Sequence, residues 1–404
     1  MTASVLQQSL GDSAPKVVVL GSMCRLPVAG VVYQILHYMI GLQRLGFDPY
    51  YVEWHGNWVE DPGPSPAAAR RVIVAEVMRR FGFGERWACR ADQLGPGATF
   101  GSLSGDAVRR LYAEAVALFN VTGAHFIDDE MRQCPRRLYV ETDPGIPQIR
   151  TANGDPGMLA LLAGHTHFCT FAENIANPDC QLPPGTIPYR TTRQPVVLDM
   201  WSGPARPGAA FTTVARWRKP KEKAIEFRGE RYRWNKDLEF EAFLDLPGRC
   251  GRRFELALSD IAAQDQSRLE ASGWAVVDAI ELSASLDAYR DYIAGSAGEF
   301  TIAKDQYVRL RTGWFSDRSA CYLAAGRPVI TQDTGFGCAL PTGAGLFAFQ
   351  SRDDVLAALA LVEADYATHA RAAREIARTY FDAGRVLGEI LDWMGVEPPL
   401  GVCG

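Results

Sequence analysis

The stretch from Thr312 to Gly337, TGWFSDRSACYLAAGRPVITQDTGFG, contains two loops whose residue types are suited to binding an anion. The first loop is polar and ends at Ser316 and Asp317, whose short side-chain oxygens can cap a helix. The first backbone N–H groups of such a helix have no partners within the helix and attract negative charge. The sequence predicts this helix over 319–325, opening with Ser319.

The second loop follows a short apolar run over 328–332, which predicts a buried strand. The loop reads Asp333-Thr334-Gly335-Phe336 and is followed by another glycine. Glycine lets the backbone come close to a ligand, and a carboxylate accepts hydrogen bonds from hydroxyl groups. Two loops of this kind at one sheet edge predict a site for the diphosphate of a nucleotide sugar.

Basic and acidic side chains near the ends of predicted strands could complete the chemistry. Arg318 lies beside the first loop and Lys304 follows a predicted strand, so both could stabilise a leaving diphosphate. Sugar transfer with inversion also needs a general base to take a proton from the acceptor. Asp143, which stands between a predicted strand and Pro-Gly, and His165, in the segment GHTHF, are the leading candidates. The other histidines considered are His167, His37 and His55.

The composition excludes several classes of protein. A chain of 404 residues with 47% hydrophobic and 22% charged residues is typical of a globular protein with two domains. A net charge of -5 argues against a general nucleic-acid-binding protein, which usually has a basic face. The nine cysteines form no CxxC pair, which favours free thiols in the cytoplasm and no zinc site. We find no signal peptide and no apolar run long enough to span a membrane.

The elements that must position these residues alternate between strand and helix along the whole chain. In the first half, the pattern predicts strands over 17–20, 49–53, 137–142 and 167–172, and helices over 31–45, 66–81, 106–119 and 158–163. The loop 21–30, GSMCRLPVAG, joins the first strand to the first helix. Gly21 and Gly30 would bring this loop close to a ligand, although the spacing is not GxGxxG.

The second half repeats the alternation. It predicts strands over 211–215, 254–257, 275–278, 299–303 and 329–332, and helices over 238–243, 286–294, 319–325, 352–380 and 385–394. An insertion over 218–234, rich in Lys, Arg and aromatic residues, is interpreted as a hairpin or loop with a solvated, charged surface. Ligands of open α/β sheets bind beyond the carboxyl ends of the strands, so two such units predict a site in the cleft between them.

The sequence resembles the GT-B glycosyltransferases over most of its length, especially a bacterial group of them. The most specific part is GEFTIAKDQYVRLRTGWFSDRSACYLAAGRPVITQDTGFGCALPTGAGLFAF, from Gly298 to Phe349. Other matching pieces are Glu141-Thr-Asp-Pro-Gly, Gln194-Pro-Val and Asp245-Leu-Pro. The resemblance implies an α/β protein with two Rossmann-like domains facing a central cleft. Residues 1–200 would bind the acceptor, residues 201–384 the nucleotide sugar, and the last helix, within 385–404, would pack back on the first domain.

The resemblance also implies roles for individual residues. Arg216 and Lys236 correspond to basic residues that hold the donor diphosphate, and the loop from Asp333 to Phe336 would lie near the sugar. The co-substrate would be a UDP-, GDP- or dTDP-sugar, with no permanently bound cofactor and no metal. A small-molecule acceptor, as in natural-product biosynthesis, is the preferred expectation, and a homodimer is compatible with the sequence.

One position departs from the pattern of the family. Many retaining members have a glutamate that holds the donor ribose in the helix before the Gly-x-Pro-Val turn. Cys321 occupies that place here, so the ribose contacts would come from Ser316, Asp317 or Ser319. The stereochemistry of transfer is therefore open at this stage.

Three other functions remain as alternatives. A sugar-nucleotide epimerase of the same fold would use paired carboxylates near the sugar and no acceptor. An NAD-dependent oxidoreductase would need a GxGxxG loop and an acidic residue further along the chain, for which Glu53 is the candidate. A binding or scaffold protein would have kept the fold without catalysis.

Overall fold

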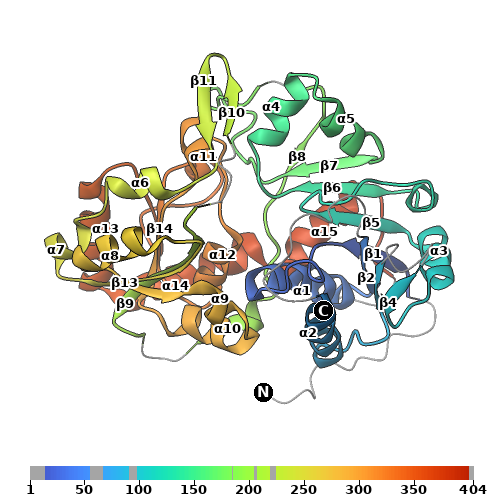
Figure 1. Ribbon diagram of the computed structural model, residues 1–404, viewed down its shortest axis with the longest axis horizontal. Helices are drawn as coiled ribbons and strands as arrows, with labels where there is room; N and C mark the ends of the chain where they lie inside the picture. Colours follow the sequence, from blue (N-terminus) through green and yellow to red (C-terminus); the bar gives the residue numbers. More distant parts are fainter. Residues whose placement is uncertain are drawn as a thin grey trace.

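The computed structural model describes residues 14–54, 67–90, 98–183, 185–203, 207–218 and 224–399, and these form two α/β domains (Figure 1). In the N-terminal domain the strand order is β4-β3-β2-β1-β5-β6-β7-β8, and all neighbours run parallel except β3 and β4. Its strands are β1 (Lys16–Leu20), β2 (Asp48–Trp54), β3 (Trp87–Arg90), β4 (Thr99–Gly101), β5 (Ala117–Val121), β6 (Arg137–Glu141), β7 (His167–Thr170) and β8 (Arg190–Thr191).

Helices connect and cover these strands. They are α1 (Ala29–Arg44), α2 (Ala67–Arg80), α3 (Gly105–Glu114), α4 (Ile146–Ala152) and α5 (Pro156–Ala163), with short helical turns η3 (Met131–Gln133) and η4 (Leu198–Trp201). The apolar run of β1 is completely buried over Val17–Leu20, as expected for a central strand covered on both faces. The order of strands reverses between β1 and β5. In sheets of this kind, a crevice for ligands lies at such a point, beyond the carboxyl ends of the strands.

The C-terminal domain contains a parallel sheet with the order β13-β12-β9-β14-β15-β16. Its strands are β9 (Ala210–Arg216), β12 (Arg253–Ser259), β13 (Ala275–Asp278), β14 (Gly298–Thr301), β15 (Val329–Gln332) and β16 (Leu346–Phe349). Its helices are α6 (Asp237–Glu241), α7 (Leu246–Cys250), α8 (Ala263–Ala271), α9 (Ala279–Ser283), α10 (Leu286–Gly295), α11 (Asp305–Arg309), α12 (Asp317–Ala324), η5 (Phe336–Cys338), α13 (Arg352–Ala364), α14 (Tyr366–Ile376) and η6 (Ala377–Phe381). Here the strand order reverses between β9 and β14.

The last helix, α15 (Ala383–Trp393), lies with the N-terminal domain, where Figure 1 shows it beside the blue α1. Its apolar face, with Val386, Leu387 and Ile390, belongs to the same core as Val17 and Val19 of β1. A Cβ added to Gly41 of α1 would lie 2.5 Å from Leu387, so glycine allows the two helices to approach closely. The end of the chain therefore ties the second domain to the first.

The insertion forms the predicted hairpin, with β10 (Ala224–Phe227) and β11 (Glu230–Arg233) paired antiparallel. Figure 1 shows it at the top of the molecule, next to α4 of the N-terminal domain. Ile225, Phe227 and Tyr232 pack in one apolar cluster with Ile149 of α4. The prediction of a wholly solvated surface is therefore wrong for this side of the hairpin, which contacts both domains.

Two predicted helices differ from the structure. The segment 106–119 was expected to be one helix, but α3 ends at Glu114 and residues 117–121 form β5. All five residues of β5 are buried between β1 and β6, so sheet pairing overrides the helical pattern. The segment 352–380 divides at Asp365, whose side chain accepts the Thr368 N–H and begins α14.

Candidate active site

A cleft of about 450 Å³ lies between the two domains, near the carboxyl ends of strands from both sheets. The N-terminal domain contributes the loop before α1, one side of α1 and Asp143 after β6. The C-terminal domain contributes the ends of β9 and β12, the start of α9, Lys304 after β14, and the start of α12. The residues that line the cleft include Gly30, Gln34, His37, Asp143, Arg216, Trp234, Lys304, Ser316, Asp317, Arg318 and Cys321.

The N-terminus of α12 opens into this cleft. Ser316 is the residue before the first turn and makes no side-chain capping hydrogen bond. The first amides of the helix therefore remain available to an anion, and the helix dipole adds a partial positive charge. Ser319, on the same turn, is fully buried, and within the described residues its hydroxyl has no hydrogen-bond partner.

Cations gather beside this helix end. Lys236, at the start of α6, is half-buried, and burial together with the positive charges of Arg318 and Lys304 holds its pKa well below the usual value. A lysine whose charge is opposed in this way is stabilised when a negatively charged ligand arrives. Arg216, at the end of β9, lines the cleft, which Lys236 does not, and forms an ion pair with Asp260 at 2.7 Å.

Arg318 lines the cleft but directs its hydrogen bonds into the sheet. Its Nε donates to Glu299 Oε1 at 2.5 Å, one terminal nitrogen donates to the Val214 carbonyl at 2.6 Å, and the other donates to Thr301 Oγ1 at 2.8 Å. Glu299 is completely buried, so the guanidinium balances a carboxylate that water cannot reach. Arg318 thus contributes positive charge to the cleft while it holds β9, β14 and α12 together.

Two carboxylates face the cleft from opposite domains. Asp143 Oδ1 accepts a hydrogen bond from Lys304 Nζ at 2.6 Å and another from the Tyr307 hydroxyl. Asp317 accepts a long hydrogen bond of 3.4 Å from the Gln34 side chain. Burial raises the pKa of Asp317 to about 6; the Gln34 bond opposes this shift and the nearby negative charge of Asp143 adds to it.

His165 and Gly21 do not line the cleft, and the structure does not support their predicted roles. His165 is buried against Asn120, whose Nδ2 lies 3.0 Å from its Nε2, and burial lowers its pKa to about 4. Its ring is thus part of the domain core and unsuited to a general base. Gly21 is required for packing, because a Cβ there would lie 2.4 Å from Ile35 of α1. Gly30 does border the cleft.

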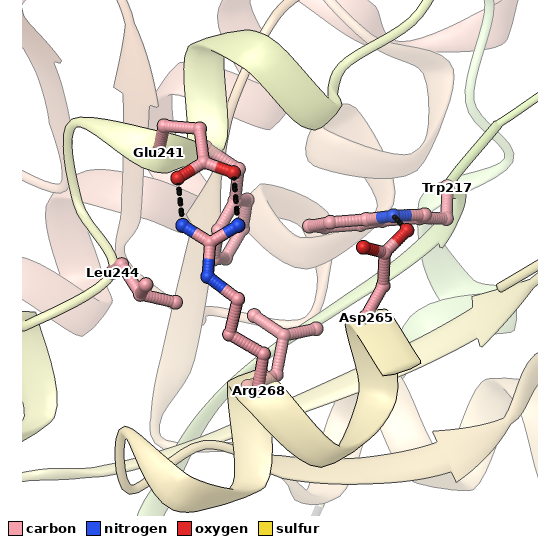
Figure 2. A pocket seen from close by; sticks show the side chains of 7 residues that line it. Trp217, Glu241, Leu244, Asp265 and Arg268 are labelled. Atoms are coloured by element: carbon pink, nitrogen blue, oxygen red, sulfur yellow. Dashed lines mark hydrogen bonds and ion pairs between the residues drawn. The ribbon is translucent and has the colours of Figure 1, made fainter. Parts of the chain in front are cut away.

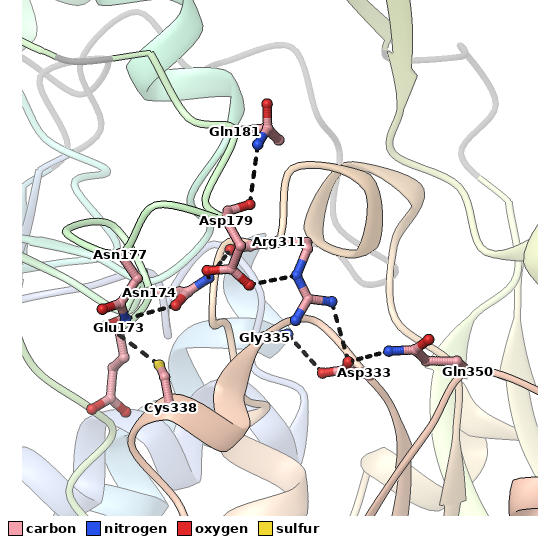
Figure 3. A network of polar contacts seen from close by, with 10 residues as sticks. All are labelled: Glu173, Asn174, Asn177, Asp179, Gln181, Arg311, Asp333, Gly335, Cys338 and Gln350. Carbon is pink, nitrogen blue, oxygen red and sulfur yellow. Dashed lines mark hydrogen bonds and ion pairs between the residues drawn. The ribbon is translucent and has the colours of Figure 1, made fainter.

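The loop from Asp333 to Phe336 also lies outside the cleft lining, which corrects the expected contact with the donor. Two of its residues, Asp333 and Gly335, line a separate polar pocket with Asn174 and Asp179 of the N-terminal domain, and Figure 3 shows the polar contacts among these residues. Asp333 accepts hydrogen bonds from the Gly335 N–H at 2.8 Å, from Arg311 at 3.2 Å and from Gln350 at 2.8 Å. Thr334 Oγ1 donates to the Trp314 carbonyl at 2.6 Å and Phe336 is buried. Since these groups are engaged within the protein, the loop supports the segment 312–315.

The cavity in Figure 2 is too small for a ligand. It measures about 10 Å³, which is room for roughly one water molecule. Arg268 pairs with both carboxylate oxygens of Glu241, and the Trp217 indole donates to Asp265 Oδ2 at 3.0 Å. Asp265 also contacts Arg218, which pairs with Asp237 directly after Lys236. These contacts fix the start of α6 and so the position of Lys236.

Many of the residues that line the cleft were not predicted to act there, Trp234 and Cys321 among them. Trp234, from the end of the hairpin insertion, places its ring 3.7 Å from Lys304 Nζ. His37 accepts the Val197 N–H at 3.0 Å, and burial lowers its pKa to about 3, so its ring is neutral. Cys321 Sγ lies 3.9 Å from His37 Nε2, and burial raises the pKa of this thiol. The aromatic residues of the insertion were the one signal in the sequence that could have indicated Trp234.

No family model and no curated protein matches the sequence. Among solved structures, an alpha-glucosyltransferase in complex with UDP and a 13-mer DNA superposes with a TM-score of 0.59 and 9% identity, covering 95% of this chain and 100% of that one.

Two bacterial structures give similar values. Anabaena HepE in complex with UDP and glucose has a TM-score of 0.56 and 11% identity, covering 94% of this chain and 99% of its own. A glycosyltransferase from Rickettsia africae has a TM-score of 0.54 and 10% identity, covering 95% and 98%. At these identities the likeness concerns the fold. The chain has the GT-B fold of these glycosyltransferases, with two Rossmann-like domains that face a central cleft.

Proposed function

We propose that this protein is a glycosyltransferase of the hexosyltransferase type that uses a nucleoside-diphosphate sugar. The observation that carries the proposal is the group of cations beside the N-terminus of α12. Arg216, Lys304 and Arg318 line the cleft there, and burial together with Arg318 and Lys304 holds the pKa of the neighbouring Lys236 low. Such a group is costly in the free protein and is stabilised by a diphosphate, whose charges it can neutralise in a partly dry cleft. UDP-, GDP- and dTDP-sugars share this diphosphate.

In the proposed reaction the diphosphate lies between the α12 amides and the cations Lys236, Lys304 and Arg216. Asp143 takes the proton of an acceptor hydroxyl, and the acceptor oxygen forms a bond to the anomeric carbon of the sugar. The bond from that carbon to the β-phosphate oxygen breaks, and the nucleoside diphosphate leaves with the electron pair. Asp317, with a pKa raised to about 6, is placed to contact the sugar or the ribose.

A small-molecule acceptor, as in natural-product biosynthesis, fits the N-terminal side of the cleft. Leu26, Val28 and Val31 give this wall an apolar character, and Tyr33 adds an aromatic ring. The net charge of -5 favours a small molecule over DNA, the molecule present in one of the similar structures. The described cysteines are all free, which supports a reducing compartment such as the cytoplasm. No described helix has the length and apolar character of a membrane span.

A sugar-nucleotide epimerase is the second candidate, because Asp143 and Asp317 both face the cleft. An epimerase would use paired carboxylates and no acceptor. The NAD-dependent alternative is disfavoured, since Glu53 is buried and accepts the Cys24 N–H at 2.6 Å and the Arg25 N–H at 2.8 Å. Its carboxylate is thus engaged by the loop before α1 and is not available to a ribose.

A donor and acceptor screen by mass spectrometry tests the proposal. The protein would be incubated with a panel of UDP-, GDP- and dTDP-sugars, each with and without a pooled library of hydroxylated small molecules. Glycosyl transfer predicts a product heavier by one sugar that appears only with an acceptor. A new sugar-nucleotide isomer formed without acceptor would favour the epimerase, and oxidation of an alcohol with NAD would contradict both.

A further inference from the structure

The ion pair between Asp143 and Lys304 joins the two domains across the cleft. Asp143 follows β6 of the N-terminal domain, Lys304 follows β14 of the C-terminal domain, and Nζ lies 2.6 Å from Oδ1. The lysine side chain is 16% exposed and the aspartate side chain 44%, so one face of the carboxylate meets the open cleft. The group proposed to take the acceptor proton is thus bound to a cation proposed to hold the diphosphate.

Lys304 stands where a diphosphate would compete for it. Its Nζ lies over the Trp234 ring at 3.7 Å, and its charge, with that of Arg318, lowers the pKa of Lys236. An anion that enters between these side chains attracts all three cations. The ammonium group cannot be in close contact with the carboxylate and with a diphosphate at the same time. A stronger electrostatic attraction to one anion therefore means a weaker attraction to the other.

Asp143 has a second hydrogen-bond donor besides Lys304, the Tyr307 hydroxyl, which itself accepts a hydrogen bond from Lys304 Nζ at 3.1 Å. The Tyr307 hydroxyl also donates to Oδ1, and the Tyr307 ring stacks on Trp314 with centroids 4.3 Å apart. The Trp314 indole donates to the Thr142 carbonyl at 2.9 Å, directly before Asp143. Tyr307 and Trp314 can therefore hold the aspartate in position after the lysine has moved.

We propose that Lys304 is shared between Asp143 and the donor diphosphate, so that donor binding draws the lysine away and frees the carboxylate to accept a proton. Lys304 and Tyr307 are then positioning residues for Asp143. The inference rests on the proposed function. It makes the donor the first substrate to bind, because the carboxylate is neutralised by Lys304 until the diphosphate arrives. It also makes donor affinity depend on Asp143, a residue of the acceptor domain.

The test is a double-mutant cycle in which binding of UDP, GDP and dTDP is measured by titration calorimetry. The four proteins are the wild type, Asp143→Asn, Lys304→Met and the double variant, each compared with the wild type by melting temperature. Asp143→Asn is expected to bind the preferred nucleotide up to about fivefold more tightly, which is the range set by the coupling energies of partly exposed ion pairs. The gain is expected to disappear when Lys304 is already methionine.

A control variant separates this effect from a general loss of negative charge in the cleft. Asp317→Asn removes a carboxylate from the same cleft but leaves the Lys304 pair intact, and is expected to change affinity less than Asp143→Asn. Asp143→Ala repeats the main test if the asparagine variant is unstable. An equal gain with and without Lys304, or no gain in a folded Asp143 variant, overturns the inference. A wild-type protein that binds none of the three nucleotides refutes the proposed function and the inference with it.

Discussion

Replacing Lys236 by methionine should weaken nucleotide binding and at the same time stabilise the free protein. Methionine keeps much of the length of the side chain and removes the charge. Burial, Arg318 and Lys304 all disfavour the charged lysine when no ligand is present, which is why its pKa is lowered. The variant therefore loses an unfavourable interaction in the free state and a favourable one in the complex.

The two effects have different sizes. A hydrogen bond to a charged group contributes about 1.5–3 kcal/mol, so the loss of the phosphate contact should raise the dissociation constant about 10- to 150-fold. The charge penalty on Lys236 is fully present below its lowered pKa and vanishes as the pH rises towards 10.5, where the unfolded lysine also loses its proton. The gain in melting temperature, about 1–2 °C per kcal/mol in a chain of this size, should thus be largest near neutral pH.

Titration calorimetry with UDP, GDP and dTDP and thermal unfolding at pH 7 and pH 10 would measure both effects. Lys16→Met is the matched control, since Lys16 forms a surface pair with Glu114, away from the cleft. The control should change neither nucleotide affinity nor the pH dependence of the melting temperature. Unchanged nucleotide affinity in Lys236→Met, or a less stable free protein, would refute the account of the cation group.

Three further predictions concern protons and the backbone. Nucleotide binding at pH 8 should take up protons, because the bound anion raises the pKa of Lys236. A terminal phosphate with a pKa near 6 is already ionised at this pH and takes up none. Calorimetry in buffers of different ionisation enthalpy detects the uptake, and Lys236→Met should abolish it. Burial raises the pKa of Glu141 from 4.5 in the unfolded chain to about 7 in the folded protein, because burial disfavours the charged carboxylate. The folded protein is therefore destabilised, relative to low pH, as the pH rises from the unfolded pKa through 7. Glu141→Gln should consequently gain up to about 3 kcal/mol relative to the wild type between pH 5 and pH 8, and a difference in unfolding free energy that does not vary with pH would contradict this. Gly313→Ala should lower the melting temperature by several degrees, since φ is +79° and the added Cβ would lie 2.4 Å from the Asn174 nitrogen; Gly154→Ala, with φ of +69° and open space around it, is the control that carries only the backbone strain.

The sequence pattern was sufficient where a strand or helix was both periodic and bounded by turn residues. The strands at 17–20, 137–142 and 329–332 and the hairpin within 218–234 were found close to their observed positions. The strand β5 was missed because Ala117–Val121 continues a helical run without a Gly or Pro between them. Only its position between β1 and β6, which is a tertiary contact, makes it a strand.

The candidate site was harder to predict because side-chain direction is not visible in the sequence. Asp143 and Lys304 were named from their places after strands, and both line the cleft. Lys236, named from its place at the start of a helix, does not line the cleft but is close enough for Arg318 and Lys304 to lower its pKa. The loop at Asp333 was expected at the same edge, yet its hydrogen bonds to Arg311 and Gln350 direct it to another pocket. A loop of this composition is compatible with ligand binding and with turn formation, and only the partners decide between them.

The central claim is that the cleft binds the diphosphate of a nucleotide sugar. The most direct measurement is the equilibrium binding of UDP, GDP, dTDP and NAD to the wild-type protein, with Lys236→Met measured in parallel. The account predicts that at least one nucleoside diphosphate binds with a stoichiometry of one per chain and raises the melting temperature, and that the variant binds it at least about tenfold more weakly. Binding of NAD alone, or binding of a nucleoside diphosphate that is unaffected by the loss of Lys236, would contradict it.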